Sequence, residues 1–169
     1  MTYTEAIPLP RVIVRRLRQE AVKRGISVEE YLLDLLSKDL NPEERAQEYI
    51  EAASELLEQA KEELKKSNIR QAAEKLWGVA ALAVKAYAYW RENRRLTSHG
   101  ELWEYILVLQ KEIGKWVSDS WNAGNSMHTC FYEGWCRKEH VEDAIEKIER
   151  LVKEVASRIK GSKHWSGRK

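Results

Sequence analysis

The sequence contains few residues that interrupt helices or cross-link chains: 8 glycines, 3 prolines and 2 cysteines among 169 residues. A β-sandwich or barrel needs many turns, so this scarcity argues against both and favours helices. The prolines lie at positions 8, 10 and 42, and nothing after Pro42 forbids long helices. Two cysteines, Cys130 and Cys136, are too few for a disulfide framework in a domain of this size, so we predict ordinary core residues.

The sequence also lacks an excess of charge of one sign, because 29 Lys and Arg against 27 Asp and Glu leave a net charge of +2. Overall charge therefore predicts neither a nucleic acid nor a membrane as a partner, and either case depends on local patches. The chain opens without the basic and apolar regions of a signal peptide, and its low-charge runs are too short or too polar to span a bilayer. We expect a cytoplasmic protein with no membrane contact.

Apolar residues at helical spacing predict an all-α fold. Residues 4–10 read as an extended segment, and two short helices follow it, the first ended by Gly25 and the second capped by Ser27 and Glu30. Five longer helices are expected between about 42 and 160. One of them is opened by a capping box of Ser98 and Glu101 and is predicted to turn Leu102, Trp103 and Ile106 inward.

The helix expected from about Asn68 to Asn93 is apolar nearly all round, which indicates the centre of a bundle. Short loops make sequential helices neighbours, so the longer helices predict a five-helix antiparallel up-down bundle. The predicted organisation is an N-terminal arm at 1–40, the bundle at 41–160 and a flexible basic tail at 161–169.

The run from Ser120 to Cys136 carries a single charge in a chain that is one-third charged. Its polar residues need hydrogen-bond partners if the helix is buried, and a core network or a ligand pocket could supply them, so both readings stay open. No usual zinc spacing occurs there, and we predict no metal and no cofactor. The candidate pocket residues are Asn122, Asn125, His128, Tyr132 and Glu133.

A second candidate site is the loop at 91–99, which places three arginines and a histidine before the N-terminus of a helix. Free backbone N–H groups and the helix dipole favour an anion there, and arginine adds bidentate phosphate contacts. The candidate phosphate- or RNA-binding residues are Arg91, Arg94, Arg95, Ser98 and His99. His99 and Arg94 are the catalytic candidates, since histidine titrates near neutral pH. The alternative is a solvated basic loop in which Ser98 only caps a helix.

The N-terminal arm is locally basic, with six Lys or Arg and one Glu between Pro8 and Ile26. Such an arm suits nucleic acid or dimerisation equally. Two short helices bury too little surface to be stable alone, so we expect a homodimer or a higher even oligomer.

Several segments carry a family resemblance: Ala-Lys-Glu-Glu-Leu at 60–64, Gln-Ala-Ala-Glu-Lys-Leu-Trp-Gly-Val-Ala at 71–80, Ala-Tyr-Ala-Tyr-Trp at 86–90, Thr-Ser-His-Gly-Glu-Leu-Trp at 97–103 and Asn-Ser-Met-His-Thr-Cys-Phe-Tyr-Glu-Gly-Trp at 125–135. With them the chain resembles the PaREP family of archaeal proteins, which is similar to the HEPN superfamily of helical bundles. The resemblance implies a HEPN-like bundle. HEPN members often dimerise, and some bind nucleotides or act as ribonucleases in toxin–antitoxin pairs. Arg94 and His99 have the Arg-to-His spacing of the HEPN ribonucleases, with Arg95 at a position that is hydrophobic in that motif.

Residues 7–36 resemble the ribbon-helix-helix fold in their apolar and turn pattern, from Ile7 and Leu9 through Gly25 to Leu35. That family reads DNA with a two-stranded ribbon formed on dimerisation. The ribbon here would offer Thr4, Ala6 and Pro8, or Glu5, Ile7 and Leu9, and neither face has a basic or amide side chain that reads bases.

We therefore expect a nucleic-acid- or nucleotide-binding helical protein, more readily a binding protein than an enzyme. It would belong to a toxin–antitoxin or defence system and have a protein partner from an adjacent gene. The alternatives are a HEPN-type ribonuclease and a non-catalytic dimerisation or protein-interaction module.

Overall fold

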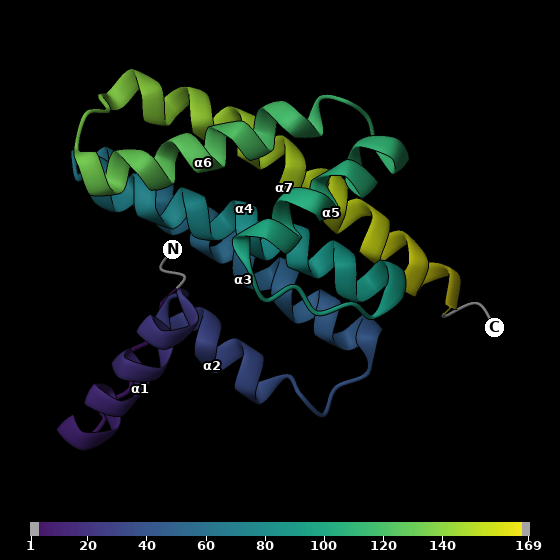
Figure 1. Ribbon diagram of the computed structural model, residues 1–169, viewed down its shortest axis with the longest axis horizontal. Helices are drawn as coiled ribbons and strands as arrows, with labels where there is room; N and C mark the ends of the chain where they lie inside the picture. Colours follow the sequence, from purple (N-terminus) through teal and green to yellow (C-terminus); the bar gives the residue numbers. More distant parts are fainter. Residues whose placement is uncertain (1–3, 167–169) are drawn as a thin grey trace.

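The predicted apolar stripes form helices throughout the computed structural model, which describes the backbone of residues 4–166 and the side chains of residues 4–161. The helices are α1 (Arg11–Arg24), α2 (Val28–Leu36), α3 (Pro42–Lys65), α4 (Ile69–Glu92), α5 (His99–Glu112), α6 (Val117–Glu133) and α7 (Lys138–Ser166) (Figure 1). No strand occurs within residues 4–166, so the all-α prediction is confirmed.

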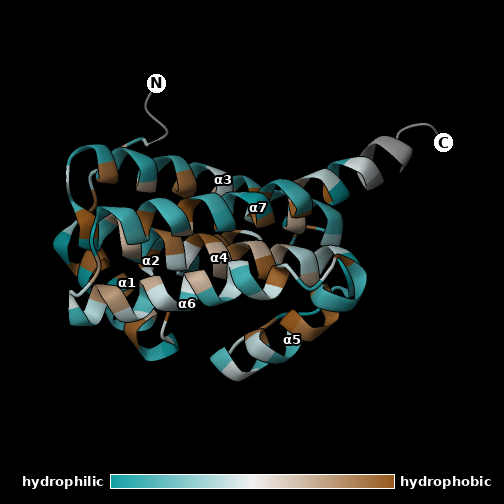
Figure 2. Ribbon diagram, turned by 90° about the horizontal axis from the view of Figure 1, so that it is seen from above, coloured by the Kyte–Doolittle hydropathy of each residue, from teal (hydrophilic) through white to brown (hydrophobic). Residues whose placement is uncertain are grey.

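The core is shared by α3, α4, α6 and α7, and α4 packs against each of the other three. Thirteen of the 24 residues of α4 are buried, among them Leu76, Tyr87 and Tyr89, which confirms it as the central helix. The shorter α5 packs against α4 and α6 and lies to one side of them (Figure 2). The structure therefore holds a four-helix core with α5 beside it, and the arrangement of five equivalent up-down helices is not confirmed.

Small residues bring α4 and α6 unusually close together. A Cβ atom added to Gly124 of α6 would stand 2.8 Å from the Cβ of Ala80 in α4. Atoms at that separation overlap, so only glycine fits at position 124 while the two helices keep their spacing. This contact places the second half of α6 directly beside the first half of α4.

The N-terminal module, α1 and α2, is attached to the bundle through carboxylates of α2. Asp34 pairs with Arg95 at 2.6 Å and with Arg45 at 3.8 Å, and Glu30 pairs with Lys85 of α4. Ser27 caps α2 as predicted by accepting a hydrogen bond from the Glu30 backbone N–H at 3.1 Å. The Glu30 carboxylate, predicted to complete a capping box, instead reaches α4. In contrast, α1 packs against α2 and projects from the rest of the molecule (Figure 1).

Two features near the end of the chain differ from the sequence-based expectation. Cys130 and Cys136, predicted as ordinary core residues, form a disulfide that ties the last turn of α6 to the segment before α7. Helix α7 continues to Ser166, six residues into the segment predicted as a flexible tail, and residues 167–169 lie outside the described part of the chain.

The search for membrane-spanning segments found none: no helix in the described part of the chain combines the length and the apolar character that a bilayer crossing requires.

Replacing Gly124 with Ala tests the close approach of α4 and α6. Overpacking of this kind costs about 1–3 kcal/mol, and the better helix propensity of alanine returns about 1 kcal/mol, so we expect a net loss of roughly 1 kcal/mol in the free energy of unfolding. Gly161→Ala is the control, because a Cβ at Gly161 meets nothing within 4 Å. Urea titrations followed by circular dichroism measure both variants, and a Gly124→Ala protein at least as stable as Gly161→Ala would contradict the packing.

Candidate functional site

The helix N-terminus predicted as an anion site is already occupied by a carboxylate of the same chain. Ser98 caps α5 and forms the predicted capping box with Glu101. The Glu101 carboxylate accepts hydrogen bonds from the backbone N–H groups of Thr97 and Ser98, at 2.5 and 3.2 Å, and from the Thr97 hydroxyl at 3.0 Å. These bonds, above all the one from the Thr97 backbone, lower the pKa of Glu101. An external anion would have to displace this carboxylate.

The arginines of the same loop also have partners within the chain. Arg91 pairs with Glu112 at 3.0 Å, and Arg95 pairs with the buried Asp34. Arg94 is the least committed of the three, since its nearest carboxylate oxygen, on Glu92, lies 4.0 Å away. The Arg94 guanidinium lies 5.5 Å from the centre of the Tyr105 ring. Of the predicted phosphate ligands, Arg94 therefore has the most freedom to bind a phosphate, while Arg95 fastens the N-terminal module.

The polar residues predicted as one pocket on α6 point in different directions. Asn125 donates to the Trp121 carbonyl oxygen of its own helix at 3.0 Å. Asn122 lines a shallow pocket between α6 and α7, and Glu133 is exposed at the end of α6. His128 packs against Trp77 of α4, and Tyr132 packs against His128. Asn122 and His128 thus face different neighbours, the first α7 and the second Trp77 of α4.

The structure brings His128 and His99 together, although the sequence placed them in separate candidate sites. The centres of the two imidazole rings lie 5.6 Å apart, and each ring packs against the indole of Trp77, at 4.8 Å for His128 and 5.0 Å for His99. Six neighbouring rings from α4, α5 and α6 are together called the aromatic–histidine cluster: Trp77, His99, Trp103, Trp121, His128 and Tyr132.

The cluster has a buried base and an exposed rim. Trp121 is fully buried, and its ring lies 5.3 Å from that of Trp77 and 5.7 Å from that of Trp103. Trp103 is 45% exposed and Tyr132 is 69% exposed, so both present ring surface to the solvent. The indole N–H of Trp121 is buried and has no hydrogen-bond acceptor within the described side chains, so one donor remains beneath these rings.

The electrostatics of the cluster depend on its two imidazoles. Burial lowers the pKa of His128, and the neighbouring His99 lowers it further because two adjacent positive charges repel. No member of the cluster is a carboxylate, so the rings present stacking surface and hydrogen-bonding nitrogens without a negative charge of their own. Such a surface suits a planar ligand that stacks on the rings and accepts hydrogen bonds.

Two members of the cluster were missed or misplaced by sequence reasoning. Trp77 was read as part of the central helix, and Trp103 was predicted to face inward with Leu102 and Ile106, whereas it is half exposed. A signal was present, because Trp103 follows His99 by four residues and Tyr132 follows His128 by four. Each pair therefore shares a helix face.

The family model described as the archaeal PaREP1/PaREP8 family matches residues 48–152, a range that contains all six members of the cluster. No curated protein and no solved structure matches the chain.

The lowered pKa of His128 predicts a pH-dependent contribution to stability. Because the unfolded chain binds a proton near pH 6.5 and the folded chain only at lower pH, this contribution is complete above about pH 6.5 and is lost as the pH falls toward the folded pKa. We expect His128→Gln to lose less unfolding free energy than the wild type between pH 7.5 and 5.5. Guanidinium titrations at both pH values measure the difference, and equal losses would show that His128 titrates normally.

Proposed function

The chain belongs to the archaeal PaREP1/PaREP8 family, and we propose that it binds single-stranded nucleic acid through the aromatic–histidine cluster. The observation that carries this proposal is the contact of His99 and His128 with Trp77, which joins three helices into one ring-lined surface. The cluster lies entirely inside the part of the chain that the family model matches.

Stacking is the interaction that this surface offers. Every nucleobase has a π-face, and a base stacked on an aromatic side chain contributes about 1–3 kcal/mol with little dependence on sequence. Trp103 and Tyr132 have the exposed ring area for such contacts. The buried Trp121 packs against both Trp103 and Trp77 and so supports the exposed part of the cluster. Bases within a duplex are already stacked on one another, so the favoured ligand is a single strand, a loop or a free nucleotide.

One phosphate of such a ligand would meet His99 at the first turn of α5, and another, farther along the strand, would meet Arg94 in the loop before that helix. Arg94 is only weakly engaged by Glu92 at 4.0 Å. The imidazoles of His99 and His128 can donate hydrogen bonds to phosphate oxygens, and a bound phosphate would favour their protonated forms. A ribonucleotide thus fits the cluster better than an uncharged planar molecule does.

Assembly as a homodimer forms part of the proposal. The N-terminal module exposes large apolar side chains, with Ile7 at 78%, Val22 at 79% and Leu36 at 77%. Exposed apolar groups gathered on a small module mark an interaction surface. A HEPN-like dimer in a toxin–antitoxin or defence system, paired with a protein from an adjacent gene, accommodates both this surface and the cluster. A purely structural interaction module would use the surface alone.

Ribonuclease activity is the second candidate, and the distance of 5.6 Å between the rings of His99 and His128 favours it. In this reaction a neutral His128 would take the proton of the 2′-hydroxyl, which attacks the adjacent phosphorus. A protonated His99 would give a proton to the departing 5′-oxygen. His99→Ala would then abolish cleavage while binding persists.

Replacing the exposed rings of the cluster tests the binding proposal. We expect Trp103→Ala and Tyr132→Ala each to weaken binding of a fluorescein-labelled single-stranded RNA by roughly 5- to 150-fold at low salt, the equivalent of one lost stacking contact. Fluorescence anisotropy measures the dissociation constants.

The matched control is Trp135→Ala. Trp135 is 44% exposed and packs against His140, outside the cluster, so its removal should leave RNA affinity unchanged. The proposal fails if the wild-type protein does not bind single-stranded RNA at low salt, or if Trp135→Ala weakens binding as much as Trp103→Ala does.

A further inference from the structure

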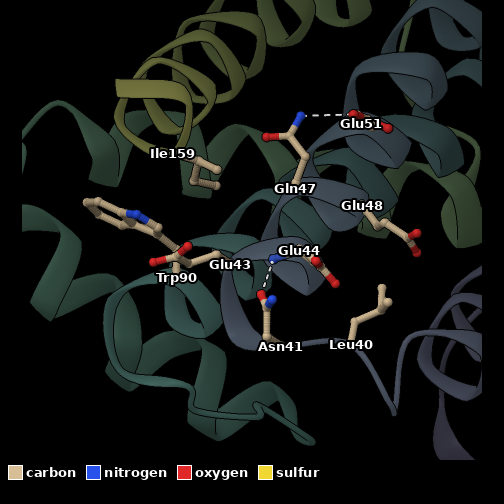
Figure 3. A pocket seen from close by; sticks show the side chains of 9 residues that line it. All are labelled: Leu40, Asn41, Glu43, Glu44, Gln47, Glu48, Glu51, Trp90 and Ile159. Atoms are coloured by element: carbon tan, nitrogen blue, oxygen red, sulfur yellow. Dashed lines mark hydrogen bonds between the residues drawn. The ribbon is translucent and has the colours of Figure 1, made fainter. Parts of the chain in front are cut away.

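A groove of about 400 Å³ opens at the start of α3, at the opposite end of the bundle from the turn between α3 and α4 (Figures 1 and 3). Its apolar part consists of Leu40, the indole of Trp90 from α4 and Ile159 from α7. Polar side chains at the start of α3 form the rest: Asn41, Gln47 and the acidic Glu43, Glu44, Glu48 and Glu51.

Several polar atoms of this groove are acceptors without a donor or cation among the described residues. Glu43, Glu44 and Glu48 form no ion pair with any described cation of the chain. The side-chain amide N–H of Gln47 donates a hydrogen bond to Glu51 at 2.9 Å. The buried side-chain oxygen of Gln47 has no hydrogen-bond partner among the described residues. A buried acceptor without a donor costs about 1–3 kcal/mol. The matching occupant therefore carries cationic donors together with apolar side chains.

Helix α1 of this protein has those two properties. Six basic residues and one acidic residue give it a net charge of +5, which leaves −3 for the remainder of a chain whose total is +2. Arg11, Arg15 and Arg18 recur at helical spacing on one face, form no ion pair within the described residues and are exposed. Exposed Val12 and Val22 stand near the two ends of the same helix.

We propose that α1 of a second copy of this chain docks in the groove at the start of α3, and that the exchange is reciprocal. Its arginines would meet the carboxylates and the Gln47 oxygen, and Val22, which lies on the same face of α1, would meet Leu40, Trp90 and Ile159. Because each copy gives one α1 and receives one, the contact closes as a two-fold dimer.

Charge and placement disfavour the simpler alternatives. Two α1 helices packed against each other would bring two charges of +5 into contact, and like charges that face each other across an interface cost several kcal/mol. The α1 of the same chain projects at one end of the molecule, while the start of α3, where the groove opens, lies at the other (Figure 1). This interface does not rest on nucleic-acid binding and can be tested without any ligand.

A charge exchange between two variant proteins tests the interface. The first carries Arg15→Glu and Arg18→Glu, and the second carries Glu44→Lys and Glu48→Lys. Each alone places like charges at both reciprocal contacts, so we expect the dimer dissociation constant of each to rise at least about tenfold. An equimolar mixture of the two restores opposite charges at both contacts, and we expect it to form a heterodimer of wild-type affinity.

Analytical ultracentrifugation of nuclease-treated protein measures the assembly, and circular dichroism verifies that each variant is folded. Glu55→Lys, on α3 outside the groove, is the control and should dimerise normally. The proposal would be overturned if the wild-type protein sediments only as a monomer at protein concentrations on the order of 100 micromolar. It would also be overturned by a Glu44→Lys, Glu48→Lys protein that dimerises with wild-type affinity, or by a mixture that stays monomeric, since either result would place the interface elsewhere.

Discussion

The contact between Ala80 of α4 and Gly124 of α6 is the constraint on which the candidate site depends. A gap of 2.8 Å to the position of a Cβ on Gly124 leaves no room for any side chain there. The two helices can therefore lie close enough for Trp77, one turn before Ala80, to touch both Trp121 and His128. If α6 moved outward by the width of a methyl group, these ring contacts would open, and α5 would lose part of the surface against which it packs.

The charged side chains near the cluster pair with one another or cap a helix, and the cluster itself contains no acidic residue, lysine or arginine. The cations that surround the loop before α5 are used for structure: Arg95 holds the N-terminal module through Asp34, and Arg91 holds the end of α5 through Glu112. The helix N-terminus is filled by Glu101. What remains for a ligand is a set of rings, two imidazoles and one lightly engaged arginine. A stacking surface with few phosphate contacts implies binding that depends less steeply on salt than that of a basic groove.

Local patterns predicted the features that are decided within one helix. The apolar stretch of α4, the cap at Ser98 and the turn at Gly25 all depend on neighbours within a few residues, and each is present. The misplaced features depend on contacts between distant segments. Asp34 and Arg95 are 61 residues apart, so the loop arginines looked free in the sequence. Trp103 was read as a core residue because periodicity reveals which face is apolar, not whether a neighbouring helix covers it.

Imidazole resonances offer the most direct test that the aromatic–histidine cluster is a nucleic-acid site. The experiment is a titration of the protein with a single-stranded RNA at low salt, followed by proton–carbon correlation spectra of the histidine side chains. His140, which packs against Trp135 outside the cluster, serves as the internal reference. We expect the signals of His99 and His128 to shift together and saturate while that of His140 stays in place. Shifts confined to other residues, with both cluster histidines unchanged at saturation, would contradict it.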